Sequence, residues 1–361
     1  MVLLLGLAGK EALSHQRTYS PVEKRELQTR PEISITKVLD GRFQKKYESY
    51  LRDQFPGRDH WVSFQTDMEL FMGKNEIHNV YIGKNHYLLE HYTEKEFDPQ
   101  QISKNLQALE KFVGKAKQNA DVHVMMVPTK SWVLREKLPA FAPHYKEQKF
   151  YDALQQKLEK EDVLISVEPV LDAHKEEEIY YRTDHHWTTQ GAFYVFQDAA
   201  KTLGIDEDVS GSFVSYTVTD QFIGVLASTS GVGLDEYEQI DIYVPSEGDD
   251  DVVVNYVDEG RKTTSLYDSS KLETRDKYGV FLGGNTSVVD IKTVSTSQRR
   301  LLIVKDSFAD CMIPFLISYY REIIVVDADY YQKHVSDLLD KNKITSVLFL
   351  YDCNHFVQMT S

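Results

Sequence analysis

The sequence has few cysteines and no arrangement of them that suggests a metal centre. Its 361 residues include two cysteines, Cys311 and Cys353, and these form neither a CxxC pair nor a Cys/His cluster. A structural zinc site is therefore not expected. A low number of cysteines is typical of a cytosolic protein, and equally of an exported bacterial protein that makes little use of disulfides. Cysteine usage leaves the compartment open.

Positive charge and long apolar runs are also scarce. The chain has 41 basic and 56 acidic residues, a net charge of -15, which argues against nucleic acid as a partner and against docking of the folded body on anionic lipid. The apolar run Met1 to Gly9 is too short to span a bilayer and lacks the positive residues of a signal peptide. It is either the end of a signal or anchor segment or an ordinary apolar N-terminus.

Local patterns divide the chain into three parts. Residues 1–36 read as a polar tether after the apolar start, or as a truncated signal or anchor. Residues 37–97 form a helical region, with two helices predicted in 38–73 that break at 55–57, followed by a hairpin over 79–89. Residues 98–361 form an α/β domain, interrupted by a β-rich insertion at about 209–296, where short Val, Tyr, Ile and Thr runs alternate with Gly, Asp and Ser.

The α/β domain is predicted from strands that alternate with amphipathic helices. This pattern indicates a parallel sheet covered on both faces. The expected helices are 99–118, 150–160, 188–203, 309–320 and 334–339, and the expected strands are 122–127, 163–167, 301–304, 323–326 and 347–350.

Ser307 is a candidate nucleophile because it directly follows an apolar strand in the run LLIVKDSF, residues 301–308. A serine at a strand-to-helix turn can expose its hydroxyl at the carboxyl edge of a parallel sheet, where open α/β folds place their sites. N–H groups of the next helix can then stabilise an oxyanion. A helix N-cap is the alternative role for this serine.

A second candidate segment reads YYRTDHHWT, residues 180–188. His186 can serve as a base towards Ser307, with Asp184 fixing its tautomer. One alternative is a metal site made of Asp184, His185 and His186, although adjacent histidines point in different directions. Another is a capping aspartate beside packed histidines. We expect the Ser–His–Asp arrangement, a structural role for His185, and neither a metal nor another cofactor.

Together these segments resemble the DHHW family of bacterial proteins. The resemblance rests on TDHHWT followed by Gly191-Ala192-Phe193, on KDSF after an apolar strand, and on FPGR at 55–58, VYIGK at 80–84, VPTK at 127–130 and FLGGN at 281–285. It covers nearly the whole chain from Pro31 onward. The family is similar to the alginate O-acetyltransferases and, more distantly, to SGNH hydrolases.

This resemblance implies a flavodoxin-like SGNH hydrolase fold in which Asp-x-His precedes the serine, a permuted motif order. It also implies Ser307 as nucleophile, His186 as base and Asp184 as the residue that orients it. An oxyanion donor is expected from Asn354 after the last strand or from Asn285 in GGN. Lys305 departs from the pattern, since SGNH enzymes usually have glycine there; its side chain would crowd the turn or add positive charge near the oxyanion.

The expected function is O-acetyl transfer to an extracytoplasmic surface polysaccharide through an acetyl-serine, with a membrane-bound O-acyltransferase as acetyl supplier. Such a protein would be secreted or anchored to the cell membrane by its N-terminal segment. Lys130, Tyr181 and Trp187 are expected either to contact sugar or to pack. The alternatives are a carbohydrate O-acetylesterase and a non-catalytic carbohydrate-binding protein of the cell surface with a degenerate triad, which Lys305 favours.

Overall fold

The computed structural model describes residues 16–20, 25–95, 97–232, 237–247, 251–341 and 343–359. The apolar run 1–9 lies outside these ranges. Among the described residues, no helix combines the length and apolar character needed to cross a membrane.

The body of the molecule is built on an eight-stranded mixed sheet with the order β11-β10-β12-β14-β13-β15-β6-β7. Strands β14, β13, β15, β6 and β7 pair in parallel, as their alternation with helices predicts, whereas β12, β10 and β11 extend one edge in antiparallel fashion. The strands are β6 (Asp121–Val127), β7 (Leu164–Ile165), β10 (Val252–Tyr256), β11 (Arg261–Thr263), β12 (Val288–Thr293), β13 (Arg300–Lys305), β14 (Glu322–Asp327) and β15 (Ser346–Asp352).

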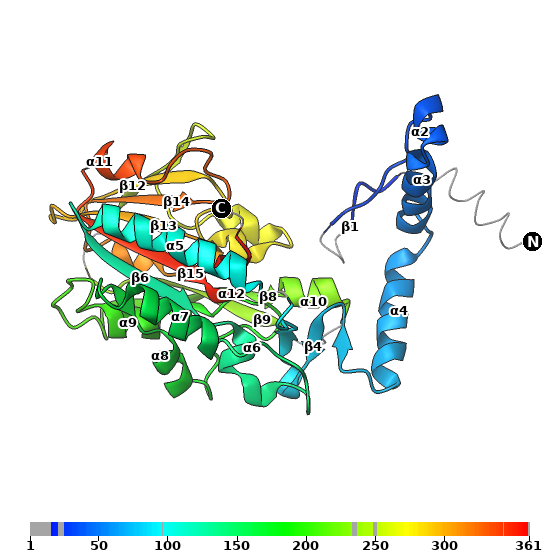
Figure 1. Ribbon diagram of the computed structural model, residues 1–361, viewed down its shortest axis with the longest axis horizontal. Coiled ribbons are helices and arrows are strands. Elements are labelled where there is room, and N and C mark those ends of the chain that lie inside the picture. The colour runs from blue at the N-terminus through cyan, green and yellow to red at the C-terminus, as the bar shows by residue number, and fades with distance from the viewer. Residues whose placement is uncertain are drawn as a thin grey trace, which may run out of the picture.

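Both faces of this sheet are covered by apolar layers. In β13, Leu302 and Val304 pack on one side, while Leu301 and Ile303 pack on the other, as the two-residue period of a strand requires. Helix α5 lies across the first face, which Figure 1 turns towards the viewer. That face also receives helices α7, α11 and α12, and the second face receives α9; the bounds are α5 (Pro99–Ala116), α7 (Gln148–Leu158), α9 (Thr189–Ala199), α11 (Asp337–Lys341) and α12 (Cys353–Gln358).

The segment 209–296 is rich in strands, and these strands belong to two different sheets. β8 (Phe213–Phe222) and β9 (Glu238–Pro245) form a separate antiparallel pair. β10, β11 and β12 instead join the main sheet next to β14. The short helix α10 (Val225–Ser230) and the 3-10 turns η3 (Ser269–Glu273) and η4 (Lys277–Val280) lie between these strands.

The N-terminal region forms a helical arm and a small sheet. The arm consists of α2 (Ile35–Leu39), α3 (Arg42–Asp53) and α4 (Arg58–Phe71), and its α2–α3 end projects from the body in Figure 1. It follows a short pair, β1 (Tyr19–Ser20) and β2 (Arg25–Glu26). The predicted break between the two long helices is present, and Gly57 there has a φ of 70°, which glycine adopts without strain.

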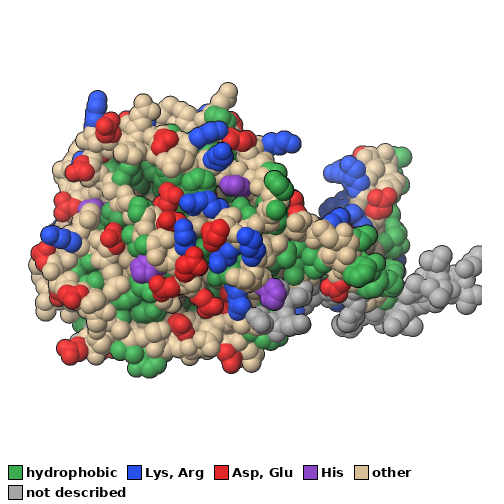
Figure 2. Space-filling view, turned by 90° about the horizontal axis from the view of Figure 1, so that it is seen from below, with side chains coloured by type: hydrophobic (Ala, Val, Ile, Leu, Met, Phe, Trp, Pro, Cys, Tyr) green, Lys and Arg blue, Asp and Glu red, His purple; other side chains and the backbone are tan. Residues whose placement is uncertain are grey.

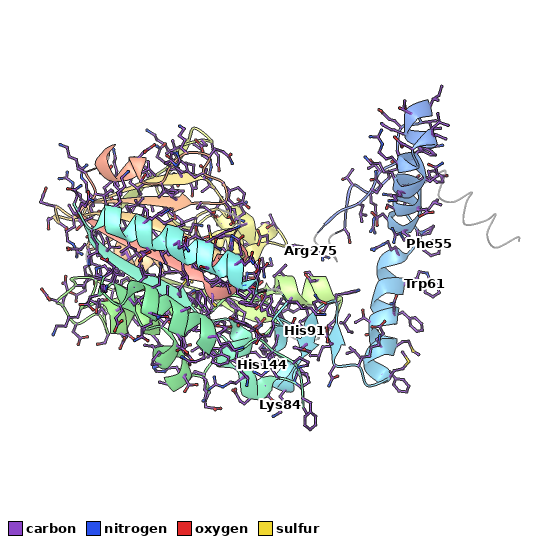
Figure 3. The ribbon with its side chains drawn as sticks, in the orientation of Figure 1. Phe55, Trp61, Lys84, His91, His144 and Arg275 are labelled. Atoms are coloured by element: carbon purple, nitrogen blue, oxygen red, sulfur yellow. The ribbon has the colours of Figure 1, made fainter. Side chains whose placement is uncertain are left out.

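Apolar side chains gather on the arm, as the space-filling view shows (Figure 2). Phe55 and Trp61 point away from the body (Figure 3), and Trp61 is 60% exposed. On its other side α4 meets the body, where Leu70 packs against the cluster around Leu226.

The hairpin predicted at 79–89 is also observed, as β4 (Val80–Ile82) and β5 (Leu88–Glu90), and β3 (Glu76–Ile77) adds a third strand.

One predicted helix is wrong. Residues 309–320 form no α-helix; instead the chain makes the 3-10 turns η5 (Ser307–Ala309) and η6 (Ile313–Leu316). Pro314 lies at the start of η6 and has no N–H to donate to a preceding turn. The apolar residues of this segment are completely buried, so their helical spacing reflects packing on all sides rather than one amphipathic face.

Candidate active site

Ser307 and His186 meet at the carboxyl edge of the parallel strands. Ser307 follows β13 and lies in η5, and its hydroxyl is partly exposed. His186 Nε2 lies 2.7 Å from Ser307 Oγ, and His186 Nδ1 lies 2.6 Å from Asp184 Oδ1. Segments 121 residues apart in the chain therefore form a continuous Ser–His–Asp hydrogen-bond chain.

The Asp184 carboxylate is buried but well supplied with hydrogen bonds. Its Oδ1 accepts from the His186 N–H at 3.1 Å, and its Oδ2 accepts from the Val225 N–H at 2.8 Å. Burial alone would raise the pKa of Asp184, but the imidazoles of His185 and His186 and these hydrogen bonds hold the pKa well below its usual range. Asp184 is thus kept ionised and can fix the ring orientation of His186.

The loop that carries these residues is held by its neighbours rather than by regular structure. Glu238 of β9 accepts hydrogen bonds from the Arg182 N–H at 2.5 Å, from the Thr183 N–H at 2.8 Å, and from the Thr183 hydroxyl. Thr183 Oγ1 in turn accepts from the Gly224 N–H at 2.8 Å. Buried backbone groups that would otherwise lack partners are satisfied, so the loop has one defined conformation.

Of the two roles expected for Lys130, Tyr181 and Trp187, sugar contact or packing, their burial fits packing. All three are at most 2% exposed. Lys130 belongs to α6 (Lys130–Val133), and its ammonium donates to the carbonyl oxygens of Tyr181 at 3.0 Å, Arg182 at 3.3 Å and Asp184 at 2.5 Å. Trp187 Nε1 donates to the Phe308 carbonyl at 2.9 Å, which ties the histidine loop to the serine turn.

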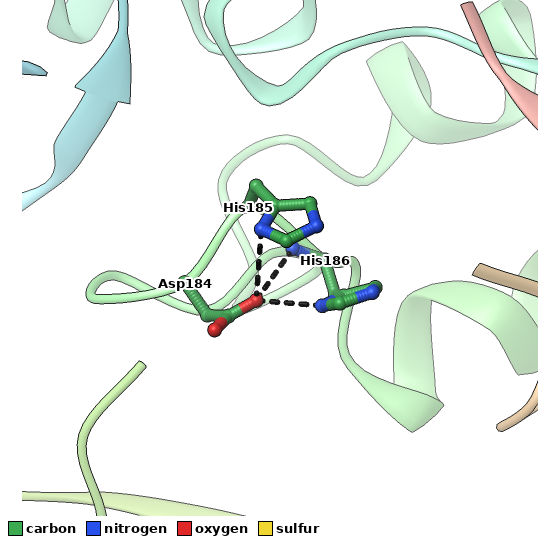
Figure 4. A group of neighbouring side chains, drawn as sticks. All are labelled: Asp184, His185 and His186. Carbon is green, nitrogen blue, oxygen red and sulfur yellow. Dashed lines mark hydrogen bonds and ion pairs between the residues drawn. The ribbon is translucent and has the colours of Figure 1, made fainter. Parts of the chain in front are cut away.

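His185 and His186 share the Asp184 carboxylate, as Figure 4 shows. His185 Nδ1 lies 3.4 Å from Asp184 Oδ1, and burial lowers the pKa of His185, with the nearby His186 adding to the effect. One potential ligand atom from each of these three side chains lies within 4.8 Å of the others, a spacing that a metal site also shows. The 2.6 Å contact between His186 Nδ1 and Asp184 Oδ1 leaves no room for an ion between them, so this geometry fits hydrogen bonding better than common ligation.

An aromatic ring covers the face of His186. Tyr278 of η4 stacks on the imidazole with centroids 3.9 Å apart and an interplanar angle of 14°. Its hydroxyl donates to the Ser307 carbonyl at 3.4 Å. Tyr278 therefore contacts both members of the Ser–His pair and restricts rotation of the imidazole.

Lys305 does not crowd the serine turn. Its side chain is buried and does not line the cleft, with Nζ 2.7 Å from Asp310 Oδ1 and 3.7 Å from Asp327 Oδ2. Burial alone would lower the pKa of Lys305, but the two carboxylates raise it overall. Its charge is thus neutralised locally and is not offered to an oxyanion.

A cleft of about 440 Å³ opens beside Ser307. It includes Asn354 at the start of α12, whereas Asn285 lies elsewhere, exposed and donating to the Tyr330 hydroxyl at 3.2 Å. Of the two predicted oxyanion residues, only Asn354 lines the cleft. The other described lining residues are Glu90, Tyr92, His185, Asp306, Phe308, Asp329, Asp352, His355, Gln358 and Met359.

Sequence reasoning missed several of these residues. Asp329 and Asp352 follow the strands β14 and β15, so the rule that placed Ser307 at the carboxyl edge would have placed them there too. Glu90 ends β5 of the small N-terminal sheet, and Glu238 lies in β9. No local signal relates Glu238 to the loop it holds or Glu90 to the cleft it lines.

The chain matches known sequences over its central part. The family model of the DHHW proteins matches residues 100–326. The probable alginate O-acetylase AlgJ of Pseudomonas syringae pv. tomato is 30% identical over 183 residues, which are 47% of this chain and 44% of that protein. The match thus spans less than half the length of that relative.

Solved structures share the fold over most of the chain. A DHHW family protein from Eubacterium siraeum superposes with a TM-score of 0.61 at 21% identity, covering 79% of this chain and 94% of that one. Bacillus cereus PatB1 with a sulfonyl adduct gives a TM-score of 0.60 at 20% identity, covering 78% and 96%. These likenesses show the fold, and the family match over residues 100–326, which is more than half of the chain, shows that the chain belongs to the DHHW family.

Proposed function

We propose that this protein is an O-acetyltransferase that acts on an extracytoplasmic polysaccharide through an acetyl-serine at Ser307. The single observation that carries the proposal is the hydrogen-bond chain from Ser307 through His186 to Asp184. Nucleophile, base and orienting carboxylate are the parts that acyl transfer requires. The similarity of this protein to a probable alginate O-acetylase supports acetyl as the transferred group and a carbohydrate as the acceptor.

In this mechanism Ser307 Oγ attacks the carbonyl carbon of an acetyl donor while its proton passes to His186 Nε2. The imidazolium returns that proton to the oxygen of the leaving group, and an ester of Ser307 remains. A sugar hydroxyl then attacks the ester, loses its proton to His186, and releases Ser307, which takes the proton back. Asp184 stays ionised throughout and stabilises the imidazolium in both steps.

The oxyanion of each tetrahedral intermediate is assigned to two donors, the Ser307 N–H and the Asn354 side chain. Asn354 lines the same cleft as Ser307. Its Oδ1 accepts from Gln358 Nε2 at 2.5 Å, which turns the amide NH₂ group away from Gln358 and leaves it for another acceptor. Preorganised donors of this kind are worth about 10²–10³ in rate each.

The fold is proposed to be a flavodoxin-like SGNH arrangement with a permuted motif order. Supporting this, the Asp-x-His pair precedes the serine in sequence, and both reach one edge of a parallel sheet. Extracytoplasmic location, membrane anchoring through the N-terminal segment, and acetyl supply by a membrane-bound O-acyltransferase belong to the same proposal.

Two alternatives use the same residues. An O-acetylesterase would pass the acetyl group from Ser307 to water instead of to a sugar. A carbohydrate-binding protein with a degenerate triad was favoured by Lys305, but that side chain is paired with Asp310 and Asp327 outside the cleft. Because the Lys305 side chain does not enter the cleft, it is no longer a reason to prefer a non-catalytic protein over an enzyme.

The test is transfer of acetyl from p-nitrophenyl acetate to an oligosaccharide, followed by mass spectrometry of the sugar. Wild-type protein is expected to acetylate the sugar, Ser307→Ala is expected to be inactive, and Ser318→Ala, which removes an exposed hydroxyl outside the cleft, serves as the matched control. Release of acetate without acetylated sugar would favour the esterase. Equal inertness of wild type and Ser307→Ala would overturn the catalytic proposal.

A further inference from the structure

The cleft that holds Ser307 is lined by carboxyl groups. There are four among its described lining residues, those of Glu90, Asp306, Asp329 and Asp352, and the basic side chains there are His185 and His355, with no lysine or arginine. Two lysines in the segments that build the site are committed elsewhere. Lys130 lies behind the histidine loop, bonded to carbonyl oxygens, and Lys305 is paired with Asp310.

These carboxyl groups differ in how they face the cleft. Asp306 and Asp352 are buried beneath its floor: Asp306 Oδ2 accepts from the Asp352 N–H at 2.7 Å, and Asp352 Oδ2 accepts from the His355 N–H at 3.0 Å. Burial raises the pKa of both. Asp329 is 43% exposed and contacts His355 Nε2 at 2.7 Å. Glu90 is half-buried and accepts from the Tyr92 hydroxyl at 2.5 Å.

Neutral sugars and amino sugars suit this lining, whereas uronates do not. Carboxylates accept hydrogen bonds from sugar hydroxyls and ammonium groups but offer no donor to a sugar carboxylate. A like charge next to them raises the free energy of the complex, and a cleft with low-dielectric walls strengthens the repulsion. The lining thus discriminates against anionic polymers, even though alginate, which the similar AlgJ is named for, consists of uronic acids.

Resting on the proposed function, we infer that the acceptor of this protein is a neutral or amino-bearing carbohydrate and not a polyuronate. The cleft supplies hydrogen-bond acceptors around Ser307, and the two accessible carboxylates, Glu90 and Asp329, repel acidic sugars. Asp329 contacts the His355 imidazole, so it repels an anion less than Glu90 does. A single like-charge contact near a protein surface changes an equilibrium by about tenfold, and this sets the expected preference.

The test compares acceptors of equal length that differ in charge: a neutral glucan oligomer, a glucosamine oligomer and a uronate oligomer, each with p-nitrophenyl acetate as donor. Wild-type protein is expected to use the neutral and glucosamine oligomers at least about tenfold better, in kcat/KM, than the uronate oligomer. Added salt should narrow this ratio, because exposed charges are screened.

Two variants locate the effect. Asp329→Asn and Glu90→Gln are each expected to improve the uronate oligomer relative to the neutral one, while Glu207→Gln, which removes an exposed charge outside the cleft, should leave the ratio unchanged. The ratio is measured within one protein, so a general loss of activity does not disturb it. Equal or better use of the uronate oligomer by wild type would overturn the inference while leaving Ser307-dependent transfer intact. Loss of Ser307-dependent transfer to every acceptor would instead overturn the proposed function.

Discussion

Gly224 is the position where a single methyl group tests the geometry of the triad most directly. A Cβ added there would lie 2.3 Å from Asp184 Cβ and 2.6 Å from Asp184 Oδ2. Carbon atoms in contact prefer about 3.5–4.0 Å, so the two groups must separate by roughly 1 Å or more. Gly224 has a φ of -81°, which alanine adopts freely, so the perturbation falls on Asp184 and not on the backbone of residue 224.

The expected consequence of Gly224→Ala is a loss of alignment. A shift of about 1 Å takes Asp184 out of hydrogen-bond range of the Val225 N–H or of His186, and misplacements of this size cost about 10²-fold in rate. Overpacking also lowers the free energy of unfolding by about 1–3 kcal/mol. The assay is acetyl ester turnover together with thermal denaturation. Gly211→Ala is the control, because an added Cβ there meets nothing within 4 Å.

A second variant removes a hydrogen bond to Asp184 without adding bulk at residue 224. Val225 is the first residue of α10, a position that accepts proline, and its N–H donates to Asp184 Oδ2 at 2.8 Å. Val225→Pro is expected to reduce turnover about tenfold, in line with one hydrogen bond to a charged group. Wild-type turnover by folded Gly224→Ala and Val225→Pro would refute the role given to Asp184.

Three further predictions concern the groups around the site. Asp184→Asn should lower turnover of p-nitrophenyl acetate by about 10³–10⁴-fold with little loss of stability, because an amide holds His186 in the wrong tautomer. Lys130→Met should lower the midpoint of thermal unfolding by several degrees, because the carbonyl oxygens of Tyr181 and Asp184 lose the ammonium donor that they share; an unchanged midpoint would contradict this. Burial raises the pKa of Asp310 to about 6, so the stability it contributes is full below about pH 4 and is lost as pH rises through 6. The free energy of unfolding, measured by urea titration at several pH values, should change less between about pH 4 and about pH 6 in Asp310→Asn than in the wild type. An unchanged pH dependence of this free energy would contradict the prediction.

Much of the α/β body could be predicted from sequence because its strands are continuous apolar runs between amphipathic helices. The runs 301–304 and 347–350 lie within β13 and β15, and the helix 99–118 is α5, two residues shorter. The helix predicted over 309–320 failed because periodicity cannot distinguish a buried helix from buried 3-10 turns. The antiparallel edge β12-β10-β11 was beyond reach because pairing across long loops leaves no local pattern.

The core of the candidate site could be predicted, and its surroundings could not. Ser307, His186 and Asp184 stand in short motifs whose chemistry is recognisable, and they meet as expected. Lys130 and Trp187 were expected either to contact sugar or to pack, and the sequence could not decide between these roles; their polar groups donate to buried carbonyl oxygens. Whether a lysine faces solvent or a buried loop depends on tertiary packing, which no window of sequence records.

The central claim is that His186, oriented by Asp184, makes Ser307 a nucleophile. The most direct measurement is rapid-quench mass spectrometry of the protein after mixing with p-nitrophenyl acetate. We expect an acetyl group on the peptide that contains Ser307 in the wild type, and none above background in His186→Ala. Acetylation of a different residue, or an equal yield of acetyl-Ser307 in His186→Ala, would contradict it.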